Sequence, residues 1–470
     1  MSEESLPKLT KAPIPVQTHT LRMDERMAKG KALRDVAARN QQSEWKPPAN
    51  RADPVDLLIE NSRGRIEELL PIRYGRMMVS PFTFYRGAAA IMAYDLSHTP
   101  STGLTLLADG DCHLLNFGGF ATAERQLIFD INDFDEVSIA PWEWDVKRLA
   151  TSFVIGGQSN GFDPADCKEA AWLAAQAYRL RMAEYTDMST LQVWNDVFDL
   201  DAIIEGMSSK EMKRFYTKKL SGAKEQSAHE KEFAKLVFTA GDTPRIVDHP
   251  PLIFHYGDQR DKDLFQTAIT TLDEYKKNVS LGVRWLVERF AVVDVAYKVV
   301  GVGSVGTICG IILLMSGQGD PLFLQFKQAR QSVLEPYCGA SPFEHAGQRV
   351  VVGQRAMQTA SDMFLGWATG TGKMHRHFYL RQLNDAKIKP VIEIMKPINL
   401  KNYAGLCGRV LARAHARTGD PVVLTGYMGK STAFEDALVD FSIAYAKQNE
   451  RDHAALLAAV RNGKIEAHSE

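Results

Sequence analysis

The sequence contains little cysteine and no excess of either charge. Its 470 residues include five cysteines, and no two of them form a C-x-x-C pair. Scattered cysteines in odd number favour free thiols in a reducing compartment and argue against a zinc knuckle. The 56 Lys and Arg residues nearly balance the 57 Asp and Glu residues, giving a formal net charge of -1. We therefore expect no general affinity for nucleic acid, which requires clustered basic residues.

Long hydrophobic runs are also missing. No stretch approaches the roughly 18 apolar residues of a membrane span, and the opening MSEESLPKLTKAP lacks the apolar core of a signal peptide. We therefore expect a cytoplasmic protein without a membrane partner. Its hydrophobic content of 45% and charged content of 24% are those of an ordinary globular chain, and its length leaves room for two or three domains.

The distribution of apolar residues divides the chain into four parts and predicts an α+β fold. Residues 1–50 are polar, and we expect a loosely ordered arm or a segment wrapped over the main body, with a surface helix around 22–39. Residues 51–295 have apolar residues at three-to-four spacing, which predicts a helical lobe. Residues 296–390 carry strand signals and predict a small antiparallel sheet lobe, whereas residues 391–470 return to helices that complete the helical lobe.

Within these parts the patterns predict individual elements. Strands are expected at 104–108 and 126–133, because short apolar runs there are bounded by polar turns. The segment 280–297, SLGVRWLVERFAVVDVAY, is expected to be helical. A later helix is expected over 342–360, with Ser341 as its N-cap.

A glycine-rich loop lies at the start of the predicted sheet lobe. Gly301, Gly303 and Gly306 form G-x-G-x-x-G, a pattern that also occurs in ordinary hairpins. A dinucleotide-binding loop would lead into a helix, but here the chain continues into TICGIILLM, which has the composition of a strand. Strand, glycine loop and strand is the arrangement that covers nucleotide phosphates in kinases. Glycines and the adjacent Ser304 would let backbone amides approach phosphate oxygens.

A lysine follows at the end of the next predicted strand. Lys327, in LFLQFK, is suited to neutralise the α- and β-phosphates of a nucleotide, although a solvated lysine at a strand end is an equally simple interpretation. A kinase lysine also needs a carboxylate to hold it in place. Glu335 lies nearby in QSVLEP, and we prefer it to Glu344 as the partner.

The stretch GDCHLLNFGGF, residues 110–120, carries the candidate catalytic residues. Asp111 and Asn116 have the D-x-x-x-x-N spacing of a kinase catalytic loop, in which the Asp accepts a hydroxyl proton and the Asn binds metal. Asp133 follows a predicted strand and is placed to be a second Mg²⁺ ligand. His113 lies between them as a further catalytic candidate or a structural hydrogen-bonding group. Asp and Asn are also common in ordinary turns.

These motifs together resemble known families. GDCHLLN, NDFDE and WDVKRLA resemble the aminoglycoside-phosphotransferase type of kinase-like fold, which shows H-G-D-x-H-x-x-N, I-D-[FW]-[DE] and then a helix with D-x-x-x-[LA]. Taken with PFTFYRGAA, GVGSVGT, QFKQA and LARAHARTGD, they look like a bacterial family called domain of unknown function 2252. The resemblance implies that Asp111 is the base, that Asn116 and Asp133 bind metal, and that Asp145 braces the catalytic loop. It also implies that Lys327 and the glycine loop hold ATP.

The chain departs from the usual kinase pattern in two respects. Asp109 stands where the catalytic loop usually has a His. The order of motifs is also inverted, because the glycine loop follows the catalytic motifs by nearly two hundred residues. A circular permutation would explain this order, since chain termini often lie close together at a protein surface. It requires Gly303 and Lys327 to face Asp111 and Asp133 across one cleft.

The expected function is an ATP- and Mg-dependent phosphotransferase that acts on a hydroxyl group of a small molecule or a protein. Two alternatives keep the nucleotide: a pseudokinase that regulates a partner, or an enzyme that transfers AMP to a protein. A third uses Asp111, His113 and Asp133 as a hydrolase metal site. It would leave the glycine loop and Lys327 without a role.

Overall fold

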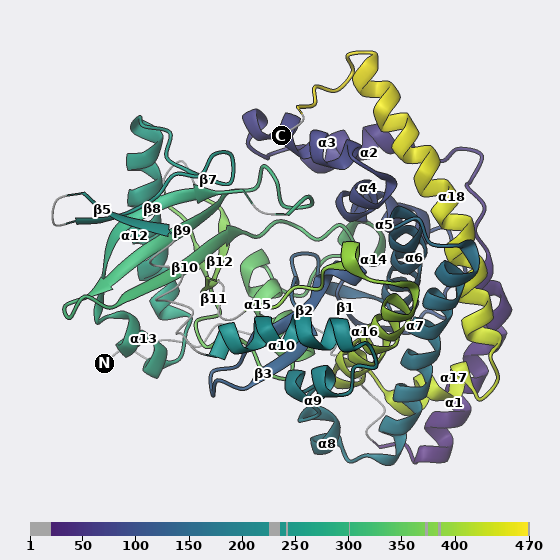
Figure 1. The fold of residues 1–470 in the computed structure, drawn as a ribbon. Coiled ribbons are helices and arrows are strands. Elements are labelled where there is room, and N and C mark those ends of the chain that lie inside the picture. Colours follow the sequence, from purple (N-terminus) through teal and green to yellow (C-terminus); the bar gives the residue numbers. More distant parts are fainter. Residues whose placement is uncertain are drawn as a thin grey trace.

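The computed structural model describes residues 20–224, 236–240, 243–299, 301–371, 375–383 and 387–468. The fold is α+β, and the strands of the described residues pair in antiparallel sheets. A six-stranded sheet stands on one side of the molecule and a large helical body on the other (Figure 1). Among the described residues, no helix is both long and apolar enough to cross a membrane.

The six-stranded sheet has the order β11-β12-β10-β9-β8-β7. Its centre is a meander, in which β8, β9 and β10 are consecutive along the chain and adjacent in the sheet. β9 is apolar at every position from Ile311 to Leu314 because both faces are covered: Ile312 and Leu314 join one hydrophobic cluster, whereas Ile311 and Leu313 join another. The bounds are β7 Ile253–Phe254, β8 Phe290–Lys298, β9 Cys309–Ser316, β10 Pro321–Gln328, β11 Gly366–Thr369 and β12 His377–Gln382.

Two predictions in this region are wrong. The segment 280–297 is only half helical, because α13 (Leu281–Val287) ends before β8 begins, and the β-branched FAVVDVAY pairs with β9. The sheet consequently begins earlier than residue 296. The second error concerns the N-cap of the later helix: α15 spans Ala346–Met357 and is capped by His345, whose Nδ1 accepts a hydrogen bond from the Gln348 amide at 3.1 Å. Ser341 instead accepts from the Phe343 amide.

Two short two-stranded sheets order the segment that carries the candidate site residues. The strand predictions at 104–108 and 126–133 are confirmed, since β1 (Thr105–Ala108) pairs with β4 (Ser138–Pro141) and β3 (Leu127–Ile131) pairs with β2 (Phe117–Ala121). The turn between β1 and β2 is the GDCHLLN stretch, and the turn between β3 and β4 is NDFDE. The two motifs are therefore held side by side by strand pairing.

Helix α6 lies inside the helical body, since every residue from Trp142 to Gly157 is buried. Helices α7 and α16 can approach closely because Gly408 has no Cβ. A Cβ at this position would collide with the Ala174 carbonyl oxygen. The central helices are α6 Trp142–Ser159, α7 Pro164–Glu184, α16 Pro397–Thr418, α17 Pro421–Met428 and α18 Ala433–Arg461. The helices before the first strand are α2 Pro54–Ser62, α3 Leu70–Met78, α4 Pro81–Gly87 and α5 Ala89–Leu96. Further helices are α8 Thr190–Trp194, α9 Leu200–Glu205, α10 Lys210–Lys224, α12 Gln259–Lys277 and α14 Glu335–Cys338.

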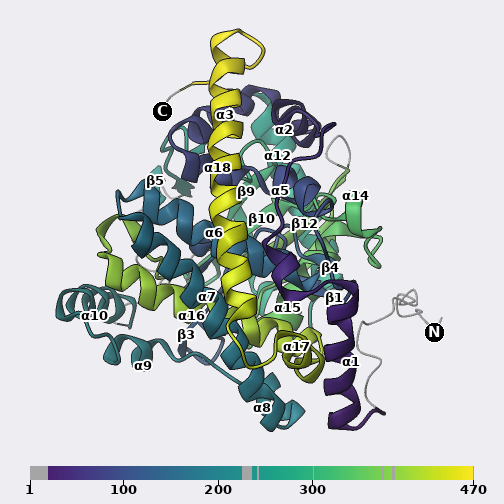
Figure 2. The same cartoon turned by 90° about the vertical axis from the view of Figure 1, so that its right-hand side faces the viewer.

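The expected N-terminal surface helix is confirmed over part of its range. Helix α1 (Met23–Val36) packs along α17 at the edge of the helical body (Figure 2). The two helices contact each other at Gly30 and Gly426, which have no Cβ. A Cβ at Gly30 would collide with the Val423 carbonyl oxygen. Residues 20–50 are thus wrapped over the main body, while residues 1–19 of the expected arm lie outside the described residues.

Candidate functional site

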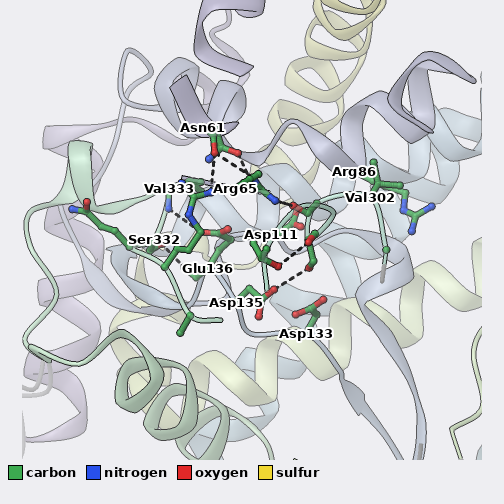
Figure 3. Close-up of a pocket in the computed structure, with 18 of the residues that line it drawn as sticks. Asn61, Arg65, Arg86, Asp111, Asp133, Asp135, Glu136, Val302, Ser332 and Val333 are labelled. Carbon is green, nitrogen blue, oxygen red and sulfur yellow. Dashed lines mark hydrogen bonds between the residues drawn. The ribbon is translucent and has the colours of Figure 1, made fainter. Parts of the chain in front are cut away.

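A cleft of about 370 Å³ lies where the glycine-rich loop approaches the catalytic stretch (Figure 3). The structure brings most of the predicted site residues to its wall, although they are far apart in the sequence. Those lining the cleft are Asp111, His113, Asn116, Asp133, Gly301, Gly303 and Ser304. Gly303 thus shares this cleft with Asp111 and Asp133, whereas the predicted site residues Gly306, Lys327 and Glu335 are not among its lining residues.

The glycine-rich loop joins β8 to β9 and is held by residues between α2 and α3. Arg65 Nη1 donates to the carbonyl oxygens of Gly303 at 2.8 Å and Val305 at 2.7 Å. The Gly306 carbonyl accepts from the Ile66 amide at 2.7 Å. Gly301 and Gly306 have φ values of +61° and +84°, which side chains rarely adopt. The loop is a hairpin, as the simplest interpretation allows, and its carbonyls are fixed while Val302 and Gly303 face the cleft.

Lys327 is paired differently from the prediction. Its Nζ bonds Asp135 Oδ2 and lies 3.8 Å from Asp133 Oδ1. Although burial acts to lower it, these two carboxylates raise the pKa of Lys327 well above its usual value. Glu335 instead accepts from the Ser332 and Ser341 amides and lies 3.8 Å from Arg349, so the expected Lys327–Glu335 pair is replaced.

Asp135 is the centre of this network. Its Oδ2 also accepts from Ser304 Oγ at 3.1 Å, and its Oδ1 accepts from Tyr379 Oη at 2.7 Å. Burial acts to raise the pKa of Asp135, but Lys327 outweighs it and holds this pKa below its usual value. A single carboxylate therefore connects the glycine loop, the third strand of the meander and the NDFDE turn.

The catalytic stretch is braced from below by α6. Asp145 Oδ2 accepts from the Asp109 amide at 2.6 Å, and Oδ1 accepts from the Gly110 amide at 3.0 Å. The other side of Asp145 is held by His415, whose Nε2 lies 3.1 Å from Oδ2. The Asp109 side chain is fully buried, and its carboxyl oxygens have no hydrogen-bond partner among the described residues. Burial and the nearby Asp145 raise the pKa of Asp109 well above its usual value, which favours its protonated form.

Asp111 faces the cleft and is held by a cation. Its Oδ1 accepts from Arg148 Nε at 2.8 Å and also from Arg148 Nη2, while 22% of its side chain remains exposed. Burial raises the pKa of Asp111 to about 7 against the opposing effect of Arg148, and Glu136 and Asp133 contribute to the rise. The carboxylate is therefore poised to gain or lose a proton near neutral pH.

His113 and Asn116 complete the wall beside Asp111. Burial, with Arg86 and Arg148 nearby, lowers the pKa of His113 well below its usual value, so the ring is neutral. Its Nδ1 accepts from the Leu115 amide at 3.2 Å, which gives it a structural role in the turn. Asn116 Nδ2 donates to the Asp111 carbonyl at 2.7 Å, so Oδ1 is the atom that Asn116 can offer to a ligand.

Oxygen donors for a divalent cation gather at one end of the cleft. Asp133 is 39% exposed, and its Oδ1 has no hydrogen-bond partner among the described residues. With Asn116 Oδ1 it forms a hard-oxygen donor set of the kind that Mg²⁺ prefers. Within the described ranges, no three His, Cys, Asp or Glu residues are grouped to hold a metal ion. A Mg²⁺ ion here would need phosphate or water oxygens to complete its shell.

Several residues of the site were not predicted from the sequence. Arg65, Arg148 and Asp135 fix the glycine loop, the candidate base and Lys327, respectively. Arg148 could have been found, because it lies three positions after Asp145 on α6 and so on the same helix face. Arg65 acts on a segment far away in the chain, and no local pattern marks it. Asp135 lies in the NDFDE motif, but nothing in that motif indicates that its partner is Lys327.

The chain belongs to the bacterial family described as "Uncharacterized protein conserved in bacteria (DUF2252)", whose model matches residues 65–459. The resemblance noted in the sequence motifs is confirmed at this level. Neither a curated protein nor a solved structure matches the chain. The matched segment starts at Arg65 and contains the whole cleft except its wall residues before that position.

Proposed function

We propose that this member of the DUF2252 family is a phosphotransferase that uses ATP and Mg²⁺ to phosphorylate a hydroxyl group of a small molecule or protein. The observation that carries the proposal is the meeting, in one cleft, of a glycine-rich hairpin with Asp111, Asn116 and Asp133. Kinases combine these elements because phosphoryl transfer depends chiefly on positioning and charge neutralisation.

The arrangement of the sheet supports a kinase-like small lobe. The glycine loop joins the first two strands of the meander, and Lys327 lies on the third, as in protein kinases. Helix α15 then separates β10 from β11. The helical body would be the large lobe, encoded on both sides of the sheet. The inverted order of the motifs is what a circular permutation of such a fold would produce.

Lys327 and the glycine loop would hold the nucleotide phosphates. In kinases a Glu from the helix after the third strand steadies the lysine. Here Glu335, at the start of the short α14, is bonded to other groups, and α15 contains no acidic residue. Asp135 supplies that carboxylate instead, and Ser304 ties the glycine loop to the same oxygen. Phosphate oxygens entering between Lys327 and the loop would meet a fixed ammonium group and glycine amides, which favour anions.

Asn116 and Asp133 would hold Mg²⁺, which supplies charge neutralisation between the phosphates. Asp133 Oδ1 without a hydrogen-bond partner among the described residues fits this role. Asp111 would orient the acceptor hydroxyl and accept its proton, and a pKa of about 7 suits a base that works near neutral pH. Arg148 would keep that carboxylate in one orientation through its two hydrogen bonds.

The decisive experiment supplies the full-length protein with ATP carrying a label on the γ- or α-phosphate, together with fractionated bacterial metabolites and proteins. We expect Mg-dependent thermal stabilisation by ATP and appearance of the γ-label in an acceptor. Asp111→Asn should retain nucleotide binding and lose transfer of the γ-label. Asp133→Asn should abolish the part of the thermal stabilisation by ATP that requires Mg²⁺. Asp163→Asn, an exposed aspartate before α7, is the matched control.

Three results would contradict the proposal. Transfer of the α-label would indicate movement of AMP. Nucleotide binding without transfer to any fraction would indicate a pseudokinase. Absence of any stabilisation by ATP with Mg²⁺ would remove the nucleotide from the account altogether.

A further inference from the structure

A second cavity, of about 360 Å³, lies on the other side of the β2–β3 hairpin. It is enclosed by that hairpin, α9, α10, the first half of α16 and the segment around Ile388. Figure 1 shows α9 and α10 on the outside of the helical body, next to β3 and α16. Among the described residues, the two cavities share no lining residue. The volume of this second cavity is typical of a small-molecule binding site.

The wall of this second cavity is mainly apolar and uncharged. Met207, Met212 and Met395 lie among aliphatic and aromatic side chains, and methionine adapts readily to the shape of a ligand. None of the described lining residues carries a charge. The polar ones include Ser208 and Asn402, which are 3.4 Å apart (Oγ to Nδ2) and join the start of α10 to α16. Such a wall suits a hydrocarbon chain.

Helix α10 adds positive charge outside this apolar wall. Its inner face buries Met212, Tyr216 and Leu220. Its other positions up to Lys219 include five basic residues and one acidic residue, Glu211, which pairs with Lys396 at 3.1 Å. The basic residues are Lys210, Lys213, Arg214, Lys218 and Lys219. A helix with one apolar and one basic face is typical of elements that meet anionic lipids.

We propose that this cavity binds the acyl chain of an anionic amphiphile, with the chain among the methionines and the head group near the basic residues of α10. The cavity also touches the machinery of the cleft. Tyr403 lines it, and the Tyr403 hydroxyl donates to the Leu114 carbonyl, in the turn that carries Asn116, at 2.6 Å. Gly119 lines it two positions beyond Phe117, which follows that turn directly. A ligand in the cavity would therefore contact residues that support the turn carrying Asn116.

The test measures binding of laurate, below its micelle-forming concentration, to the full-length protein without nucleotide. It is therefore independent of the proposed phosphotransfer. We expect a saturable rise in the thermal midpoint. Ile203→Trp places a large side chain in the cavity from a half-buried position and should weaken binding at least about tenfold. Leu281→Trp, at a 56% exposed position on α13, is the matched control and should bind normally.

The head group is tested separately. Lys210→Glu should weaken laurate binding about fivefold and leave binding of neutral 1-dodecanol unchanged, whereas Lys262→Glu on α12 should affect neither. Sedimentation with phosphatidylglycerol vesicles identifies the source of the chain: vesicle binding that Ile203→Trp abolishes indicates a membrane lipid, and laurate binding alone indicates a free amphiphile. Both results support the cavity. Failure of laurate to bind, or equal binding by Ile203→Trp, would overturn the proposal, and insensitivity to Lys210→Glu would overturn the anionic head group.

Discussion

The buried pair of Lys327 and Asp135 allows a prediction that does not depend on any assumed activity. Only 3% of the Lys327 side chain and 26% of the Asp135 side chain are exposed. Breaking a fully buried pair costs about 3–5 kcal/mol of unfolding free energy, because one charge is left without its partner. Asp135 is partly solvated, and Lys327 keeps Asp133 at 3.8 Å. We therefore expect a coupling free energy of about 2–3 kcal/mol between the two side chains.

The assay is a double-mutant cycle of Lys327→Met and Asp135→Asn, with urea unfolding as the measurement. The losses of unfolding free energy in the two single variants should add up to more than the loss in the double variant. The difference is the coupling free energy. Asp133→Asn provides the matched control: the same chemical change two positions away should couple to Lys327 by less than about 1 kcal/mol. A second control is the exposed pair of Lys464 and Asp56, which should show no measurable coupling.

The dependence on pH follows from the direction of the two pKa shifts. The pKa of Asp135 is lowered in the folded state, so its contribution is complete above its unfolded value of about 3.9 and is lost as the pH falls through the folded value. The pKa of Lys327 is raised, so its contribution is complete below its unfolded value of about 10.4. The coupling should therefore be constant from about pH 5 to pH 9. Coupling below about 1 kcal/mol in this window, or coupling equal to that of Asp133, would refute the assignment of Asp135 as the partner of Lys327.

Three further predictions concern the catalytic stretch. Because deprotonated Asp111 is the basic form, kcat/KM of the phosphotransfer should rise with pH through about 7; Arg148→Gln removes the cation that lowers this pKa and should move the profile to higher pH, Arg148→Lys should shift it less, and an unmoved profile would exclude Asp111 as the base. Asp145→Asn should cost about 3–5 kcal/mol in urea unfolding, since Asn can no longer accept from both loop amides and face His415 with a charge; a loss below about 1 kcal/mol would contradict the brace. Gly110→Ala, where φ is +80° and a Cβ would lie 2.6 Å from the Glu136 carbonyl oxygen, should cost about 2–4 kcal/mol, against about 1 kcal/mol for Gly103→Ala, where φ is +71° and the space is open; equal losses would show that the approach to Glu136 is unimportant.

Local patterns were sufficient for the parts of the fold that local physics determines. The strands around the catalytic stretch and the two strands that follow the glycine loop are short apolar runs bounded by polar or glycine turns, and they agree with the prediction. The segment 280–297 was misjudged because its apolar residues fit a helical spacing until Val287 and a strand spacing from Phe290 onward. Only pairing with β9, a contact made across the hairpin, decides between the two.

The partner of Lys327 shows why a site is harder to predict than a strand. Glu335 was preferred because it is near Lys327 in the sequence, whereas Asp135 lies 192 positions away. Distance along the chain has no bearing once the NDFDE turn contacts β10, because ion pairing depends on separation in space and on burial. Asp145 and Arg148 differ in this respect. They lie three positions apart on α6, so the placement of one beneath the GDCHLLN turn fixes the other beside Asp111. On one helix, the position of a site residue therefore predicts the position of its neighbour three residues away. Residues on segments far apart in the sequence allow no such prediction.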